Sequence, residues 1–410
     1  MTVAVVTKLQ TSNLGNLALS TELLRNARAR AGDGVVAFDR PMQLAAFGLD
    51  WLERQRDPVR SVEIAAQVLR RLPGGASQIR PPGESPRFVG VAEATSRPRP
   101  ALVKAIGRAV RPLLPASRRR WATLRSSRIV YYAGAGAITD HDALVQLLIE
   151  MRALQLSGVT VVPVCQSVIV TRPALRRVLG EVYGMMPDIF VRGPSSAESL
   201  VSMGVRPGRV HLAADFVWWS EAFEPRMESE RSGVGLSLTS PVVRDLGGGL
   251  RPVLEVLRSV DSKLVGISSD QGQDSAIIDS LARQESVERQ DVIGDARAYT
   301  RALSGFRVVV TARFHTAVMA LLAGVPTVAL SGTIDQRASE TFARLGYPVP
   351  VVRTNEPGVL DRLNHALSVA ASLQHRDTRA VIERARAEAI SQLAALDGAR
   401  AAGFMEARKA

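Results

Sequence analysis

The chain has 410 residues, a length that suits two domains of ordinary size better than a single core. Hydrophobic residues make up 46% and charged residues 22%, which indicates a globular protein and excludes a disordered one. The one cysteine, Cys165, excludes a disulfide framework and a thiolate metal cluster, and it suits a reducing compartment.

The start of the sequence lacks the pattern of a secretory signal. The most apolar stretch, residues 317–330, is interrupted by Gly324 and Pro326 and is too short to predict a membrane span. We therefore expect a cytoplasmic protein.

The net charge of +13 is concentrated in one segment, residues 70–128, where 14 side chains are Lys or Arg and only Glu84 and Glu93 are acidic. The segment is rich in proline, and residues 101–114 within it place apolar side chains at helical spacing. We expect an insertion that is either a solvated excursion or a basic amphipathic surface for an anionic membrane. The low aromatic content, 5%, argues against nucleic acid as a partner.

The N-terminal half alternates short apolar runs with helical patterns. Strands are predicted at residues 3–6, 128–132, 159–164, 189–191 and 210–212, with helices at 17–30, 141–156, 173–185 and 196–203. This order predicts a parallel, doubly wound sheet, in which ligands bind at the loops after the strands. Those loops hold Asn13, Gly15, Asn16, Gly134, Gly136, Arg192 and Asp215.

A second α/β series follows a charged stretch, residues 221–232, which is expected to be a linker. Strands are predicted at residues 234–238, 263–267, 307–310 and 325–330, with helices at 247–257, 274–284 and 316–323. The sequence thus predicts two Rossmann-like domains, at residues 1–220 and 233–375, and a C-terminal helix at residues 376–410.

The strongest local signal for chemistry is Arg313-Phe314-His315, between a buried strand and an apolar helix. An arginine, a histidine and free helix N–H groups suit a phosphate or a carboxylate, and His315 could transfer a proton near neutral pH. In the alternative, His315 caps the helix and Arg313 pairs with a structural carboxylate. Arg192 is either a second anion ligand or a surface ion pair, and Asp215 either binds a sugar hydroxyl or caps a turn.

For several other polar residues the sequence favours a structural role over a catalytic one. Asp140 and Asp142 flank His141 at a predicted helix start, where a cap is favoured over acid–base chemistry. Cys165 is expected to be a buried apolar residue rather than a nucleophile. The sequence has no P-loop, nucleophile elbow, dinucleotide fingerprint or histidine pair at metal-ligand spacing, so we predict neither a metal nor an organic cofactor.

Taken in order, these pieces resemble the polysaccharide pyruvyl transferase family. That family opens with a strand and an N-x-G-D loop, here Asn13-Leu14-Gly15-Asn16, and continues with a glycine-rich loop followed by an acid, here residues 133–140. Next come an arginine before a serine and a helix, here Arg192, and an aspartate, here Asp215. An R-x-H motif, an apolar helix and Gly-x-Pro complete the set, here residues 313–326.

The resemblance implies two Rossmann-like domains facing a cleft, as in GT-B glycosyltransferases. It implies phosphoenolpyruvate as the donor on the C-terminal side and a saccharide or glycolipid acceptor on the N-terminal side, joined into a pyruvate ketal of a cell-envelope polysaccharide with release of phosphate. Arg313, His315 and Arg192 would hold the donor, and His315 would transfer the proton. The basic segment would hold a lipid-linked acceptor, which makes the enzyme peripheral to the inner face of the membrane.

Two positions depart from the family pattern. Asn16 stands where an aspartate is usual, and a carboxamide can hydrogen-bond a sugar but cannot act as a base. Members often carry a lysine after the last strand, whereas the stretch from Ser331 to Glu340 has none and Arg337 is its nearest cation. Arginine binds phosphate but is a poor proton donor.

Two other functions stay open from the sequence. A GT-B-like glycosyltransferase would need an acid for the ribose of a nucleotide sugar, and Asp270 and Asp274 are available. A non-catalytic, glycan-binding member is favoured by Asn16, but Arg313 and His315 argue against it because such a protein has no need of an anion site.

Overall fold

The computed structural model describes residues 2–7, 10–11, 13–39, 47–71, 87–88, 115–134, 138–220, 230–247, 250–270, 274–292, 295–332 and 337–394. The amphipathic stretch expected at residues 101–114, most of the expected linker, and Gly136 lie outside the described residues. We call the described residues up to Ser220 the N-terminal unit and residues 230–371 the C-terminal unit.

The N-terminal unit contains a parallel sheet of four strands in the order β3-β1-β5-β7. These strands are β1 (Val3–Thr7), β3 (Val35–Asp39), β5 (Ile129–Ala133) and β7 (Thr160–Val164). A parallel pair, β9 (Ile189–Val191) and β10 (Val210–Leu212), joins the edge of β7 through a bridge between Gln166 and Val191. Two pairs of two-residue strands complete this unit, namely β2 (Gln10–Thr11) with β4 (Arg87–Phe88) and β6 (Ile138–Thr139) with β8 (Val168–Ile169).

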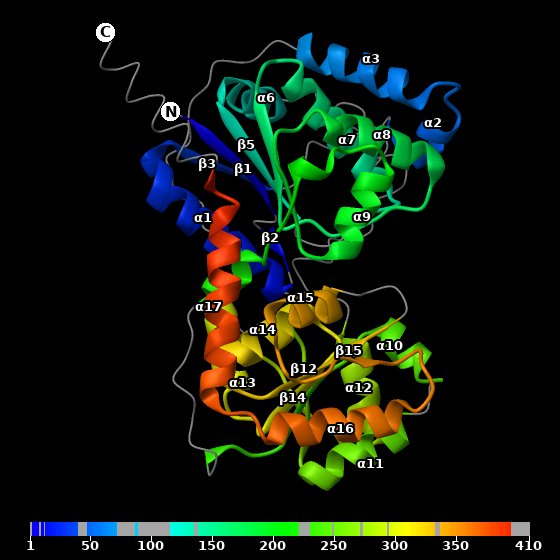
Figure 1. Ribbon diagram of the computed structural model, residues 1–410, viewed down its shortest axis with the longest axis vertical. Coiled ribbons are helices and arrows are strands. Elements are labelled where there is room, and N and C mark those ends of the chain that lie inside the picture. The colour runs from blue at the N-terminus through cyan, green and yellow to red at the C-terminus, as the bar shows by residue number, and fades with distance from the viewer. Residues whose placement is uncertain are drawn as a thin grey trace.

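Helices cover both faces of this sheet, because alternate residues of β1 point to opposite sides. Ala4 and Val6 pack with one group of helices, and Val3 and Val5 pack with another. The first group comprises α2 (Leu49–Glu53), α3 (Pro58–Arg71), α6 (Pro115–Ser126), α7 (Asp142–Gln155), α8 (Pro173–Gly184) and α9 (Pro194–Ser202). On the other face lies α1 (Leu14–Ala31) (Figure 1).

The C-terminal unit contains a parallel sheet of six strands in the order β13-β12-β11-β14-β15-β16, the order of a Rossmann sheet. The strands are β11 (Val234–Ser237), β12 (Leu264–Ile267), β13 (Glu288–Gln290), β14 (Val308–Thr311), β15 (Thr327–Ser331) and β16 (Val352–Arg353). Its helices are α10 (Ser240–Asp245), α11 (Arg251–Val260), α12 (Ser275–Gln284), α13 (Ala296–Leu303), α14 (Phe314–Leu322), α15 (Arg337–Leu345) and α16 (Val359–Ala371). The doubly wound α/β architecture predicted from the sequence is confirmed, although the helix expected at residues 247–257 begins at Arg251.

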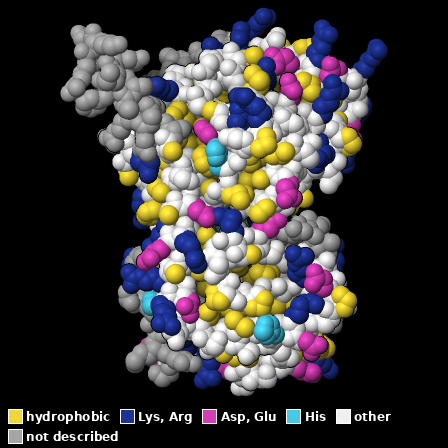
Figure 2. Space-filling model, viewed as in Figure 1, with side chains coloured by type: hydrophobic (Ala, Val, Ile, Leu, Met, Phe, Trp, Pro, Cys, Tyr) yellow, Lys and Arg dark blue, Asp and Glu magenta, His cyan; other side chains and the backbone are white. Residues whose placement is uncertain are grey.

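The last helix, α17 (His375–Ser391), runs back from the C-terminal unit along the side of the N-terminal unit (Figure 1). Arg386 of α17 donates to the carbonyls of Trp218 and Ser220, at 2.8 and 3.0 Å. This helix covers the first part of the one expected at residues 376–410 and ends at Ser391; residues 395–410 lie outside the described residues. In Figure 2 the outline of the molecule narrows between an upper and a lower lobe.

None of the helices in the described ranges combines the length and the apolar character needed to cross a membrane.

The end of α9 packs against α8 at one of the two glycines of α8, Gly180, and not at the other, Gly184. A Cβ on Gly180 would lie 2.1 Å from the carbonyl oxygen of Met203, the residue that follows α9, whereas a Cβ on Gly184 would meet nothing within 4 Å. We expect Gly180→Ala to lower the free energy of unfolding by about 1–3 kcal/mol through overpacking.

The same change at Gly184 should be neutral or stabilising by up to ~1 kcal/mol, because it only adds helix propensity. Urea unfolding followed by circular dichroism measures both. Equal stability of the two variants would contradict the described contact between α8 and α9.

Candidate functional site

The centre of the site is Asp215, a fully buried aspartate in the loop after β10. Its Oδ1 accepts a hydrogen bond from Val217 N at 3.0 Å, so it caps the 3₁₀ helix η4 (Phe216–Trp219). Its Oδ2 accepts from Arg192 Nε at 2.8 Å and lies 2.6 Å from Nη2 of the same guanidinium. Of the two roles that the sequence left open for Asp215, the structure shows the turn cap. The same side chain also forms an ion pair with Arg192.

Arg192 follows β9 and is 1% exposed, so its ion pair is buried rather than on the surface. Beyond Asp215, its Nη1 donates to Ser167 Oγ at 3.2 Å and its Nη2 donates to the Gly134 carbonyl at 2.7 Å. These bonds satisfy a buried cation that would otherwise be unfavourable. In this arrangement Arg192 holds the Asp215 carboxylate and is not presented to a ligand as a lone charge.

His315 meets the same carboxylate from the C-terminal unit. It lies in the first turn of α14, and its Nε2 is 3.3 Å from Asp215 Oδ2. The helix begins at Phe314 and its N-cap residue is Arg313, which makes no side-chain cap bond, so His315 does not cap α14. The structure thus brings Arg192, Asp215 and His315 together.

Electrostatics set the protonation of this group. Burial by itself raises the pKa of Asp215, but Arg192 and His315 outweigh burial and hold that pKa well below its ordinary value. Burial lowers the pKa of His315; Asp215 opposes this effect, and the charges of Arg192 and Arg337 add to it. At neutral pH the site therefore holds an ionised Asp215 and a neutral imidazole. If the Nε2 proton points to Asp215, Nδ1 carries the lone pair.

The first turn of α1 packs directly on His315. A Cβ on Gly15 would lie 2.2 Å from His315 Nδ1, so this approach needs glycine. Asn13 caps α1 by accepting from Asn16 N at 3.0 Å, and its Nδ2 donates to Asp270 Oδ2 at 3.0 Å. Asn16 is buried beside them. The predicted N-terminal loop thus lies at the junction of the two units, between the loop after β12 and the start of α14.

Arg313 pairs with a carboxylate of its own unit, the alternative that the sequence left open. Its Nε donates to Asp274 Oδ2 at 3.0 Å, its Nη2 donates to Asp274 Oδ1, and Asp270 Oδ2 lies 4.0 Å from its Nη1. Burial raises the pKa of Asp274, and Arg313 opposes that shift. A donor anion at Arg313 would therefore compete with Asp274.

Two further predicted residues lie where strands of the two sheets end: Gly134 directly follows β5, and Ser331 is the last residue of β15. A Cβ on Gly134 would lie 2.3 Å from the Cys165 carbonyl oxygen, so this glycine permits the close approach of the ends of β5 and β7. Ser331 ends β15, and its carbonyl accepts from Thr354 N at 2.9 Å. Both are packed into the fold behind the loops.

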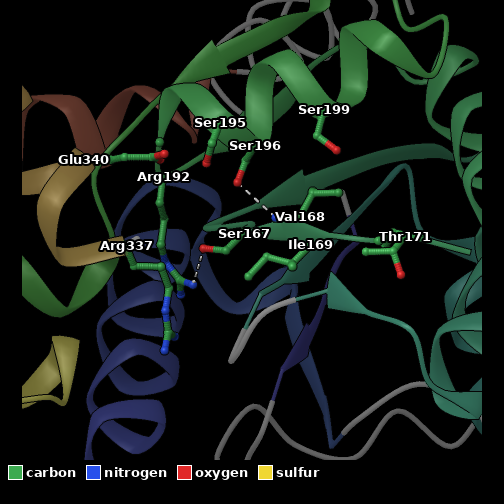
Figure 3. A pocket seen from close by; sticks show the side chains of 12 residues that line it. Ser167, Val168, Ile169, Thr171, Arg192, Ser195, Ser196, Ser199, Arg337 and Glu340 are labelled. Atoms are coloured by element: carbon green, nitrogen blue, oxygen red, sulfur yellow. Dashed lines mark hydrogen bonds between the residues drawn. The ribbon is translucent and has the colours of Figure 1, made fainter. Parts of the chain in front are cut away.

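A pocket of about 270 Å³ opens between the two units beside Arg192 (Figure 3). Arg337, the first residue of α15, lines it from the C-terminal unit together with Glu340. The N-terminal unit contributes Ser167, Val168, Ile169, Val170, Thr171, Arg192, Gly193, Ser195, Ser196 and Ser199. The prediction named Arg192 and Arg337 but missed the serines and Glu340. The serines at the start of α9, directly after a strand, were the available signal.

Three other residues singled out from the sequence, His141, Asp140 and Cys165, have structural surroundings. His141 caps α7, since its Nδ1 accepts from Leu144 N at 3.1 Å, and Asp140 accepts from Thr171 N. Cys165 is buried, and burial raises the pKa of its thiol, which keeps it protonated. Across the ranges that the structure describes, no cluster of three His, Cys, Asp or Glu side chains could hold a metal ion.

The end of α17 supports the loop that carries Asp215. Gln392 is fully buried; its Oε1 accepts from Cys165 N at 2.8 Å and its Nε2 donates to the Ala214 carbonyl at 2.6 Å. Its side chain therefore ties the end of β7 to the residue before Asp215. The sequence offered no signal for this residue.

We expect Gln392→Ala to lower the free energy of unfolding by about 1–3 kcal/mol, because it leaves two buried backbone groups without partners. The neighbouring Ser391→Ala, at an exposed position, should change it by less than about 0.5 kcal/mol. Chemical denaturation compares the two. A Gln392→Ala protein as stable as the wild type would contradict the described anchoring.

We expect NMR titration of ¹⁵N-histidine-labelled protein to give His315 a pKa below its ordinary value. Arg337→Gln should raise that pKa, because it removes a cation that opposes protonation of the imidazole. The exposed Arg353→Gln should leave it unchanged. A His315 pKa at or above its ordinary value, or one insensitive to Arg337, would contradict this electrostatic picture.

Comparison with solved structures identifies the architecture. UDP-GlcNAc 2-epimerase from Neisseria meningitidis bound to UDP-GlcNAc has a TM-score of 0.51 and 11% identity, covering 94% of this chain and 99% of that chain. Anabaena HepE in complex with UDP has a TM-score of 0.50 and 11% identity over 99% and 100% of the two chains. The epimerase of Methanocaldococcus jannaschii has a TM-score of 0.50 and 8% identity over 93% and 99%. The chain therefore has a GT-B fold.

Sequence comparison identifies the family. No curated protein matches the chain significantly. The family model described as polysaccharide pyruvyl transferase matches residues 88–333, more than half of the chain, and these residues include Arg192, Asp215, Arg313 and His315. This chain belongs to the polysaccharide pyruvyl transferase family.

Proposed function

We propose that the protein transfers the enolpyruvyl group of phosphoenolpyruvate to two hydroxyls of a saccharide or glycolipid. The products would be a cyclic pyruvate ketal and inorganic phosphate. The observation that carries the proposal is the neutral His315, held by Asp215 at the junction of the two units, in a chain of this family.

The reaction needs a group that both accepts and donates a proton. One acceptor hydroxyl adds to C2 of phosphoenolpyruvate while the methylene carbon takes a proton and becomes a methyl group. The second hydroxyl then forms the other C2–O bond as the bond to phosphate breaks, and phosphate leaves with the electron pair and that hydroxyl's proton. Two C–O bonds form, one breaks, and no metal or organic cofactor is required.

We assign the proton transfer to His315. A neutral imidazole accepts the proton of the first hydroxyl and passes it to the methylene carbon. Asp215 would stabilise the imidazolium while it exists and keep the ring in one orientation. Asn16 cannot act as a base, so His315 takes this role, and the Asn16 amide is left to hydrogen-bond a hydroxyl.

The anionic groups of the donor need cations. We propose that they contact Arg313 and that Arg313 exchanges Asp274 for the donor, since the Arg192 charge is matched by Asp215. Such an exchange keeps Arg313 paired with an anion, and the buried Asp274 that it leaves would take up a proton, because burial raises the pKa of that carboxyl and Arg313 no longer opposes the shift.

The acceptor is proposed to be lipid-linked and the enzyme cytoplasmic and peripheral to the membrane. The support is the charge of residues 70–128. Figure 2 also shows Lys and Arg side chains along the upper edge of the N-terminal unit, where α3 lies in Figure 1. Cations at such an edge would attract anionic lipid headgroups.

Isothermal titration with phosphoenolpyruvate tests the donor. We expect heat of binding with the wild type, and affinity lower by about tenfold or more with Arg313→Ala, because a hydrogen bond to a charged group is worth ~1.5–3 kcal/mol. The exposed Arg379→Ala should bind as the wild type does. Circular dichroism would confirm that each variant is folded.

A second candidate, a nucleotide-sugar enzyme, is tested in the same experiment with UDP-GlcNAc, because similar structures were solved with UDP or UDP-GlcNAc. Heat with UDP-GlcNAc and none with phosphoenolpyruvate would overturn the proposal. Where phosphoenolpyruvate binds, His315→Ala should abolish phosphate release with the acceptor while the donor still binds.

A further inference from the structure

We propose that the pocket between α9 and α15 is a binding site for an uncharged sugar ring. Its identification as the acceptor's ring rests on the proposed function, but the saccharide site itself does not. Residues from both units form it: Ser167, Ser195, Ser196 and Ser199 on one side, and Arg337 and Glu340 on the other (Figure 3).

Hydroxyl groups dominate the polar lining, and the fold fixes two of them. Ser167 Oγ accepts from Arg192 at 3.2 Å, and Ser196 Oγ accepts from Val168 N at 3.0 Å. Ser195 and Ser199 are four residues apart on α9 and so share one face of the helix. A serine hydroxyl can both donate and accept a hydrogen bond. It can therefore bind a sugar hydroxyl that acts as a donor or as an acceptor.

The charge of the lining argues against an anion. Arg192 is matched by Asp215 in full burial, and the other two charged side chains, Arg337 and Glu340, have opposite signs. A phosphate or carboxylate in this pocket would meet the Glu340 carboxylate. A sugar ring, in contrast, could donate a hydrogen bond to Glu340 and accept one from Arg337.

Size and shape fit a single ring. About 270 Å³ is just below the range of about 300–1,000 Å³ that is common for small-molecule sites, so the pocket suits one monosaccharide with the rest of a glycan outside. Val168, Ile169 and Val170 give the pocket an apolar wall, which can pack against the C–H groups of a ring.

Contacts between the units place this pocket beside Arg192, which connects it to Asp215 and His315. Glu340 lies so close to Gly193 that a Cβ there would be 1.7 Å from its Oε2, and Arg344 Nη2 donates to the Arg192 carbonyl at 3.3 Å. Arg192 lines the pocket and also touches Asp215, which touches His315. A ring in the pocket would therefore contact Arg192, whose guanidinium also binds Asp215, the partner of His315.

Saturation-transfer-difference NMR tests the site with methyl glycosides of the common hexoses and N-acetylhexosamines as probes, with and without phosphoenolpyruvate. Ser195→Trp fills the pocket from α9. Glu198→Trp places the same side chain on the same helix at an exposed position outside the lining and is the matched control. Isothermal titration with phosphoenolpyruvate is run on all three proteins.

We expect at least one glycoside to give signals with the wild type and Glu198→Trp, and these signals to fall to background with Ser195→Trp while phosphoenolpyruvate still binds. Signals unchanged by Ser195→Trp, or absent from the wild type under both conditions, would overturn the site. Loss of phosphoenolpyruvate binding in Ser195→Trp with retained glycoside signals would make the pocket a donor site and also overturn it. A fourth outcome separates the two proposals: Ser195→Trp loses glycoside binding, and none of the three proteins binds phosphoenolpyruvate. That result would support the sugar site and contradict the proposed pyruvyl transfer.

Discussion

A fully buried carboxylate can stay ionised only when donors surround it, and Asp215 meets this requirement with groups from three parts of the chain. Arg192 comes from the end of β9, Val217 N from the chain just beyond, and His315 from α14 of the other unit. The need to satisfy one charge thus fixes the end of the first sheet, the loop after β10 and the first turn of α14 relative to one another.

Because His315 and Asp215 belong to different units, the arrangement of the units and the protonation of the site are linked. The same junction contains Gly15 against the His315 ring and Asn13 bonded to Asp270. Asp215 and Gly15 both belong to the N-terminal unit. If the two units separated, His315 would lose its contacts with both residues at once. The imidazole would then lose both its orientation and much of its burial, so its acid–base behaviour depends on the closed arrangement.

The alternation of apolar runs predicted the parallel sheets, since a strand buried on both faces has a strong apolar signal. The prediction missed β3, although residues 35–38 are apolar, and it missed β13 and β16 because Glu288–Gln290 is polar and Val352–Arg353 is short. Arg192, Asp215 and His315 were each candidate site residues from the sequence. The sequence could not predict that Arg192 is matched by Asp215 or that Arg313 is paired with Asp274, because several carboxylates of the chain could have been partners. Gln392 was beyond prediction, since its partners are backbone groups distant in sequence.

The return of α17 has a consequence for how the chain is made. Leu393 is fully buried in the core that also contains Val3, Val5 and Leu19, so the first strand and one of the last described residues share one cluster. On the ribosome, the N-terminal unit emerges first but has this face of its sheet incomplete until residue 393 is synthesised. Closing so long a loop is slow, and apolar surface stays exposed meanwhile. The two units are translated one after the other, but their folding is completed together.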